Sequence, residues 1–127
     1  MTGWPHKLDH IGIRVSDLAA SKNFYARALQ PIGIALLGSS EQHAAFGTGP
    51  MPYLTVRLTD QPPASVHVAF VAETRVQVDA FYAAALGAGG TDNGPPGLRP
   101  DYHPDYYGAF VLDPDGHNIE VVKHTPE

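Results

Sequence analysis

The sequence predicts an α+β fold built from two similar halves. The hexapeptides FYARAL, at residues 24–29, and FYAAAL, at residues 81–86, are nearly the same, and a histidine precedes each by fourteen residues, His10 and His67. In each half an alternating apolar pattern typical of a strand is followed by a helical pattern and further strand patterns, so each half reads β-α-β-β-β. We expect one domain over residues 1–127, with module one over about residues 6–60 and module two over about residues 65–125.

The first module begins with a strand and a helix. In LDHIGIRV, residues 8–15, apolar and polar side chains alternate, so one face of the strand is apolar. The following SDLAASKNFYARALQ, residues 16–30, has apolar residues at helical spacing, and Ser16 or Asp17 can cap the helix. Three further short strands are predicted at IGIALLG, HAAFG and YLTVRLT, which are residues 32–38, 43–47 and 53–59.

The second module repeats this order. VHVAFV, residues 66–71, is predicted as a strand and TRVQVDAFYAAAL, residues 74–86, as a helix. The segment rich in glycine and proline at residues 87–100 is interpreted as a loop that borders a pocket or forms a lid, or else as an ordinary surface loop. Two strands follow, YYGAFVLD at 106–113 and HNIEVV at 117–122, joined by DPDG in a type I turn.

Three polar residues share the strand faces that the helices leave uncovered. By alternation, His10 and His67 point away from the helix-facing apolar residues. Glu120 alternates with Ile119 and Val121 in the last strand, so it also points away from the helices. Two imidazoles and a carboxylate suit one divalent Fe, Mn, Ni, Co or Zn ion and leave positions open for a substrate. Alternatively, the three groups line a pocket and form hydrogen bonds with one another.

The composition argues against several classes of partner. The formal net charge is −5 and the basic residues are scattered, so we expect no nucleic acid. No apolar run is long enough for a membrane span or a signal peptide, so we expect no membrane and a cytoplasmic location. There are no cysteines, which excludes disulfides and thiolate sites.

Three motifs in order resemble one known superfamily. LDHIGIRVSDLAASKNFYARAL, HVAF and FVLDPDGHNIEVV together resemble the vicinal oxygen chelate superfamily of glyoxalases, bleomycin resistance proteins and extradiol dioxygenases, over essentially the whole chain. The resemblance implies that the modules form an open, U-shaped, barrel-like mixed sheet with the helices on the outside. It implies a metal ion held by His10, His67 and Glu120, with Glu120 also catalytic. A small-molecule substrate and a homodimer are further implications.

Departures from the known branches bear on the reaction. Glyoxalase I of bacteria has a fourth ligand, a glutamate, at the position aligned with Tyr53, so we expect a glyoxalase-like lyase or isomerase that uses another base. Extradiol dioxygenases have an acid–base tyrosine where this chain has Phe110, which makes a non-heme Fe(II) dioxygenase the alternative. Bleomycin-type proteins bind an antibiotic without metal, so a non-catalytic binding or resistance protein is the other alternative.

Further residues on the predicted open faces are candidates for substrate contact. Fosfomycin-type transferases of the same superfamily need cationic residues, for which Arg14, Arg57 and Arg99 are available. The expected mouth of the cleft is bordered by Arg99, His103, Tyr106 and Tyr107, which either contact the substrate or pack the proline-rich loop. The substrate-binding residues that we predict are Tyr53, Thr55, Arg57, Arg99, Tyr107 and Phe110.

Overall fold

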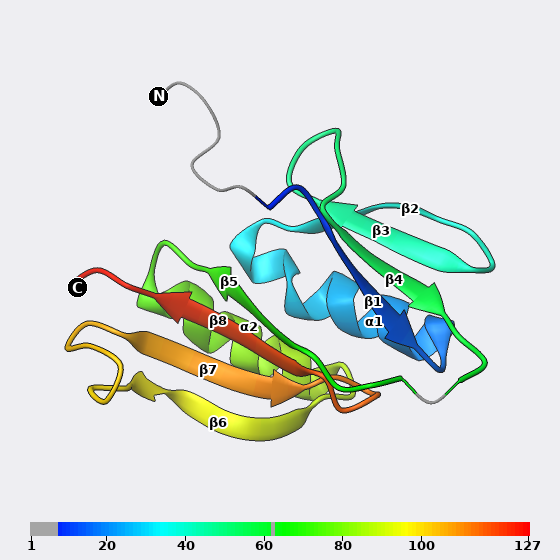
Figure 1. Ribbon diagram of the computed structural model, residues 1–127. Coiled ribbons are helices and arrows are strands. Elements are labelled where there is room, and N and C mark those ends of the chain that lie inside the picture. The colour runs from blue at the N-terminus through cyan, green and yellow to red at the C-terminus, as the bar shows by residue number, and fades with distance from the viewer. Residues whose placement is uncertain (1–7, 62) are drawn as a thin grey trace.

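A computed structural model describes residues 8–61 and 63–127 of the chain. Within these residues the protein has two α-helices and eight strands, arranged in two four-stranded mixed sheets (Figure 1). The predicted start of module one near residue 6 lies outside the described residues. No helix in the described part of the chain is long and apolar enough to cross a membrane.

Both modules have the same topology, as the repeated sequence pattern predicts. The sheet of module one has the strand order β1-β4-β3-β2 and that of module two the order β5-β8-β7-β6. In each sheet the first strand is parallel to its neighbour and the other pairs are antiparallel. The elements are β1 (Ile11–Val15), α1 (Leu18–Ala28), the 3-10 turn η1 (Gln30–Ile32), β2 (Ala35–Ser39), β3 (His43–Gly47), β4 (Leu54–Leu58), β5 (His67–Val71), α2 (Arg75–Gly87), β6 (Thr91–Leu98), β7 (Tyr107–Leu112) and β8 (Asn118–Lys123).

Strand β6 lies where the sequence indicated a loop. It is an edge strand that pairs only with β7, and register shifts between Asp92 and Gly94 and between Gly94 and Gly97 interrupt the pairing. Pro95 and Pro96 lack an amide donor, which an edge strand tolerates because one side of it needs no partner. The loop prediction was therefore wrong for residues 91–98, and the segment left between β6 and β7 is residues 99–106.

The repeated hexapeptides form the core, as predicted. Phe24 and Tyr25 of α1 and Phe81 of α2 are fully buried, and Tyr82 is half-buried against the same core. Helix α1 begins after Asp17, whose side chain accepts a hydrogen bond from the backbone N–H of Ala20. That bond satisfies one of the free donors at the start of the helix.

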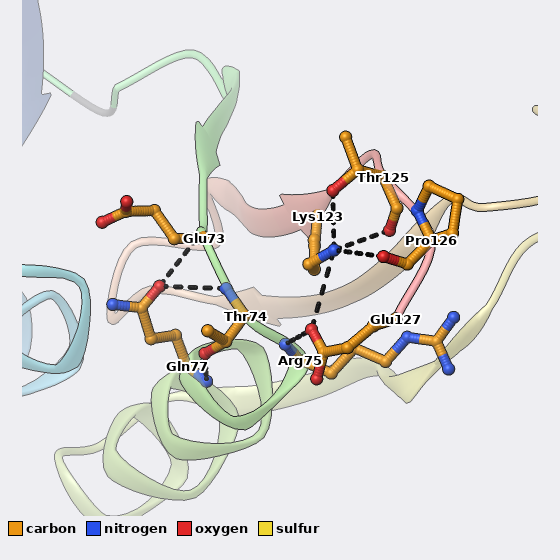
Figure 2. A network of polar contacts seen from close by, with 8 residues as sticks. All are labelled: Glu73, Thr74, Arg75, Gln77, Lys123, Thr125, Pro126 and Glu127. Atoms are coloured by element: carbon orange, nitrogen blue, oxygen red, sulfur yellow. Dashed lines mark hydrogen bonds and ion pairs between the residues drawn. The ribbon is translucent and has the colours of Figure 1, made fainter.

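The start of α2 is fastened to the end of the chain (Figure 2). Thr74 and Gln77 form a capping box, and the backbone N–H of Arg75 donates to the Glu127 carboxylate at 2.9 Å. The Nζ of the buried Lys123 donates to backbone oxygens of Thr125 and Pro126 and lies 3.6 Å from Glu127. These contacts fix the end of β8 against α2, and β8 is the strand that carries Glu120.

The two modules are joined through their helices. Helices α1 and α2 contact each other, and the helix-facing side chains of both sheets form one core. The buried Tyr25 hydroxyl donates to Asp113 at 2.6 Å, which connects α1 to the end of β7. The predicted two-module α+β fold is confirmed: the two sheets are separate and are not closed into a barrel, and α1 and α2 contact each other at the shared core.

Buried His117 connects β1 to the residue that precedes β5, and each of these strands is an edge strand of its own sheet. Its Nδ1 accepts from the backbone N–H of Val66 at 3.1 Å, so Nε2 carries the proton and donates to the carbonyl of Arg14 at 2.9 Å. The predicted DPDG turn before it has the expected hydrogen bond, from Gly116 N–H to the Asp113 carbonyl. His117 therefore belongs to the framework that sets how the modules meet.

Candidate functional site

His67 and Glu120 lie together on the face of the second sheet that α2 does not cover. Ala69 of β5 is directly opposite Glu120 of β8, so His67, two residues earlier on β5, points to the same side. His67 Nε2 is 2.9 Å from Glu120 Oε1. Glu120 is only 1% exposed, and a carboxylate buried to that extent requires polar partners.

The second oxygen of Glu120 accepts a hydrogen bond from the Tyr106 hydroxyl. Gly108 leaves room for this contact, because a Cβ there would lie 3.2 Å from the Tyr106 ring and 3.5 Å from Glu120 Oε2. Burial and the bond to Glu120 raise the pKa of Tyr106, while the positive charge of Arg99 acts in the opposite direction. Tyr106 therefore remains a protonated donor at neutral pH, and both oxygens of Glu120 are held.

Tyr107, one residue later, faces the other side of the sheet. Its hydroxyl donates to Asp79 of α2 at 2.7 Å, and the Arg75 guanidinium lies 4.9 Å from the centre of its ring. The structure thus places Tyr106, and not the predicted Tyr107, beside Glu120. The sequence already indicates this placement, because Tyr106 and Phe110 are four residues apart and alternating side chains of a strand point to the same face.

Phe110 and Arg99 extend the same face away from Glu120. Phe110 of β7 is directly opposite Glu120, and its ring centre is 6.2 Å from that of His67. The Arg99 guanidinium lies 5.5 Å from the centre of the Phe110 ring. Of the residues predicted to contact substrate, Phe110 and Arg99 are therefore neighbours of the His67–Glu120 pair.

The predicted residues of module one lie elsewhere. His10 and Tyr53 line a pocket of about 440 Å³ together with Val68–Val71 of β5. His10 Nδ1 is 2.8 Å from Asp9, which leaves Nε2 without a partner among the described residues. Further along the same open face, Thr55 and the exposed Arg57 follow on β4.

The strand registers correct one assignment within module one. Gly12 of β1 pairs with Thr55, just as Ala69 of β5 pairs with Glu120. By this internal equivalence Thr55, and not Tyr53, occupies the position that corresponds to Glu120. Neither Thr55 nor Tyr53 is a carboxylate, so Glu120 has no carboxylate counterpart at this position of module one.

Strands β1 and β5 lie beside each other where the two modules meet, and we call this junction the seam. His10 and His67 lie at opposite ends of it. His10 shares a pocket with Val71, at the end of β5, whereas Arg14 shares a pocket with Val66, which precedes His67. Strands β1 and β5 therefore run in opposite directions, and the four residues from His67 to Val71 span about 13 Å. Among residues 8–61 and 63–127, no group of three or more His, Cys, Asp or Glu could hold a metal ion.

The His67–Glu120 pair has the spacing of two ligands of one ion. Imidazole nitrogen and carboxylate oxygen bind a divalent metal at about 2.1 Å, which puts two adjacent ligand atoms about 3.0 Å apart around an octahedral ion and about 3.4 Å apart around a tetrahedral one. The observed separation is 2.9 Å. The Tyr106 hydroxyl donates to the other carboxylate oxygen of Glu120. Hydrogen bonds of this kind commonly orient the side chains that bind metals. These residues could supply two ligands of a metal site, which would need a third ligand from elsewhere.

Comparison with known proteins places the chain in a family. Residues 7–121 match the sequence profile of the Glyoxalase/Bleomycin resistance protein/Dioxygenase superfamily. The chain belongs to this superfamily. Its members bind small molecules, commonly with a divalent metal, and usually dimerise. A search of curated proteins finds no significant relative.

Solved structures of this superfamily have the same fold. A glyoxalase/bleomycin resistance protein from Albidiferax ferrireducens is 31% identical, with a TM-score of 0.76 over 92% of this chain and 98% of that one. A glyoxalase-related enzyme from Fulvimarina pelagi is 22% identical, with a TM-score of 0.73 over 92% and 87% of the two chains. A glyoxalase I mutant from Zea mays is 24% identical, with a TM-score of 0.72, and 94% of this chain matches 47% of that one.

Proposed function

We propose that the protein is a glyoxalase-like lyase or isomerase that depends on a divalent metal and acts on a small oxygen-chelating substrate. The metal would be held by His67 and Glu120 of one subunit and His10 of the partner subunit in a homodimer. The observation that carries the proposal is the His67–Glu120 pair, whose buried carboxylate is held on both oxygens. Because His10 and His67 lie at opposite ends of the junction between β1 and β5, the histidine ligand from module one would have to come from a second copy of the chain.

The exposed apolar residues around His10 support the dimer. Leu8 and Val71 are 69% and 63% exposed, and both line the same pocket as His10. Exposed apolar groups gathered in one region favour a protein contact. A second copy that covers this region would bring His10 to the open face of the partner's second module.

The roles of the residues follow from their positions. A divalent ion, when bound, acts as a Lewis acid that stabilises negative charge on substrate oxygens. Tyr106 fixes the orientation of Glu120 through one oxygen, which leaves the other oxygen and the His67 Nε2 to face the ion. Phe110 offers an apolar surface beside this pair and keeps water from one side of a bound substrate. Glu120 is the acid–base candidate, since Thr55 and Phe110 have no group that titrates.

A mixing experiment tests the shared site. His10→Ala and Glu120→Gln proteins, each alone, are expected to bind no stoichiometric metal after purification. When the two variants are unfolded and refolded together, half of the dimers are mixed and each has one intact site, so about one quarter of the wild-type metal content returns. A mixture that stays metal-free, although the wild type binds metal, would contradict a site shared between subunits.

The wild type itself tests the metal dependence. Protein offered Fe, Mn, Ni, Co and Zn in turn is expected to retain one ion per subunit. If none is retained, the metal-dependent function is wrong and a non-catalytic small-molecule binding or resistance protein becomes the better reading.

A non-heme Fe(II) dioxygenase is the second candidate, and one observation favours it. Phe110 has no hydroxyl, but the Tyr106 phenol lies against Glu120 on the same face and brings a proton donor to that region. Hemithioacetal isomerisation and oxygen uptake with catechols, measured on the same metal-loaded protein, separate the two reactions. Isomerisation without oxygen uptake is the expected result, and ring cleavage that disappears in Tyr106→Phe would establish the dioxygenase.

A further inference from the structure

A cation stands on the same sheet face as the His67–Glu120 pair. The backbone N–H of Arg99 donates to the Tyr106 carbonyl at 2.7 Å, so these two residues are neighbours between β6 and β7. The Arg99 guanidinium lies over the ring of Phe110, which is itself directly opposite Glu120. The face therefore presents, in order across its strands, an imidazole–carboxylate pair, an aromatic ring and a guanidinium.

The Arg99 side chain is held in place before any ligand binds. Its Nη2 donates to the backbone carbonyl of Pro95 at 2.6 Å. Gly94 and Gly97 leave room for it, because a Cβ at these positions would lie 3.3 and 3.1 Å from the guanidinium nitrogens. A side chain with a fixed orientation loses little conformational entropy when it binds a partner.

The charge of Arg99 is not neutralised within the described chain. Among residues 8–61 and 63–127, no Asp or Glu lies within ion-pair distance of its guanidinium. The hydrogen bonds of the described residues use one of the five donors of the guanidinium, that to Pro95. A guanidinium with free donors matches the geometry of a carboxylate.

From this arrangement we propose that Arg99 binds a carboxylate of the substrate. The substrate is then a small molecule with neighbouring oxygens at one end and a carboxylate at the other, separated by a planar or apolar part that lies on Phe110. The inference rests on the proposed function for the metal-binding end of the substrate. It adds the chemical class of the other end.

Matched probes test the proposal on protein loaded with zinc, which is redox-inert. The probes are 3,4-dihydroxybenzoate, which has vicinal oxygens and a carboxylate, and the uncharged 3,4-dihydroxybenzamide. Calorimetry on the wild type is expected to show at least about tenfold tighter binding of the benzoate, since charge-assisted hydrogen bonds contribute that much. In Arg99→Gln the ratio of the two dissociation constants falls to about one, while the affinity for the benzamide stays the same.

Control variants show whether the effect belongs to Arg99. Arg27→Gln removes an exposed arginine of α1 on the helix side of the protein and should leave the ratio unchanged. Arg99→Lys should retain part of the preference, since it keeps the charge but loses the planar fork. A ratio that is the same in wild type and Arg99→Gln would overturn the carboxylate site and leave the metal function intact.

A second measurement remains decisive if the metal site itself is wrong. In metal-free protein, the Arg99 Nε–H signal is followed by nuclear magnetic resonance while benzoate or benzamide is added. A shift with benzoate alone supports the carboxylate site without reference to metal. The absence of any benzoate-dependent shift at Arg99 would overturn it.

Discussion

The two modules have one topology, yet equivalent residues have different partners. Tyr25 of α1 and Tyr82 of α2 occupy the same place in the repeated hexapeptide. Tyr25 is fully buried and donates to Asp113 in the other module, whereas Tyr82 is half-buried and donates to Asp92 in its own module. The repeat thus builds both cores in the same way, and the differences between its copies determine how the modules join.

The same contrast divides the open faces. His67 is paired with the buried Glu120, while the polar partner of His10 within the described part of the chain is its exposed neighbour Asp9. The position equivalent to Glu120 is occupied by Thr55, whose hydroxyl is a poorer metal ligand than a carboxylate. Module two therefore carries an organised imidazole–carboxylate pair, whereas module one carries a histidine without a buried carboxylate beside it.

The largest expected effect tests the contrast between Glu120 and Thr55. Glu120→Gln should weaken metal binding by more than about 100-fold, because removing a ligand costs more than removing a partner that orients it. Thr55→Val, at the equivalent position, should change metal affinity by less than tenfold. Competition with a chromophoric chelator measures both. Equal losses in the two variants would show that the modules contribute alike.

The next effect concerns the two adjacent tyrosines. Tyr106→Phe removes the donor that holds Glu120 and should weaken metal binding about 10- to 100-fold. Tyr107→Phe removes only a bond to Asp79 on the helix side and should leave metal affinity unchanged. The same competition assay applies, and a larger loss in Tyr107→Phe would reverse the assignment of the two faces.

Tyr25→Phe should lower the free energy of unfolding by about 2 kcal/mol, because it removes a buried bond to a carboxylate. Tyr82→Phe should lower it by less than about 0.5 kcal/mol, since its bond is at the surface. Urea unfolding at neutral pH measures both values. Comparable losses would contradict the view that only Tyr25 joins the modules.

The Tyr25 variant also predicts a pH dependence. Burial, followed by the charge of Asp113, raises the pKa of Tyr25 above its ordinary value of 10.0. The unfolded chain releases this proton above about pH 10 while the folded chain retains it, so stability falls as pH rises beyond that value. Urea midpoints between pH 8 and 11 should decline less steeply in Tyr25→Phe than in wild type, and parallel curves would exclude this contribution.

The smallest effect compares the two histidines in metal-free protein. His67→Ala leaves one oxygen of the buried Glu120 without its partner and should destabilise the fold by about 1 kcal/mol, less than a fully buried pair because the His67 side chain is 53% exposed. His10→Ala should change stability by less than about 0.5 kcal/mol. Thermal unfolding measures the stability of both variants. A lower melting temperature for His10→Ala than for His67→Ala would contradict the comparison.

Much of the fold and half of the site follow from local sequence patterns. Strand alternation placed His67 and Glu120 on one face, and the helical stripe identified the buried Phe24 and Phe81. Alternation also predicts Tyr106 once the register of β7 is counted from Phe110. These features depend on periodicities of two and 3.6 residues, which a sequence displays directly.

Other features depend on contacts that no local pattern encodes. Strand β6 contains two prolines and two glycines, so its strand character comes from pairing with β7 and not from propensity. The opposite directions of β1 and β5 are set by long-range bonds such as that from His117 to Arg14. For this reason the sequence pattern identifies His10 and His67 as candidate ligands but does not show that they lie at opposite ends of the β1–β5 junction within one chain.

The two outer strands differ in a way that bears on aggregation. Both strands have a register irregularity, but β6 also has two prolines, which hinder another chain from adding a strand along it. All five residues of β2 are exposed, among them Leu36 and Leu37, and β2 contains no proline. At high temperature or high protein concentration, we expect molecules to aggregate by pairing through β2. Leu36→Lys would place a charge on this strand and should slow the aggregation.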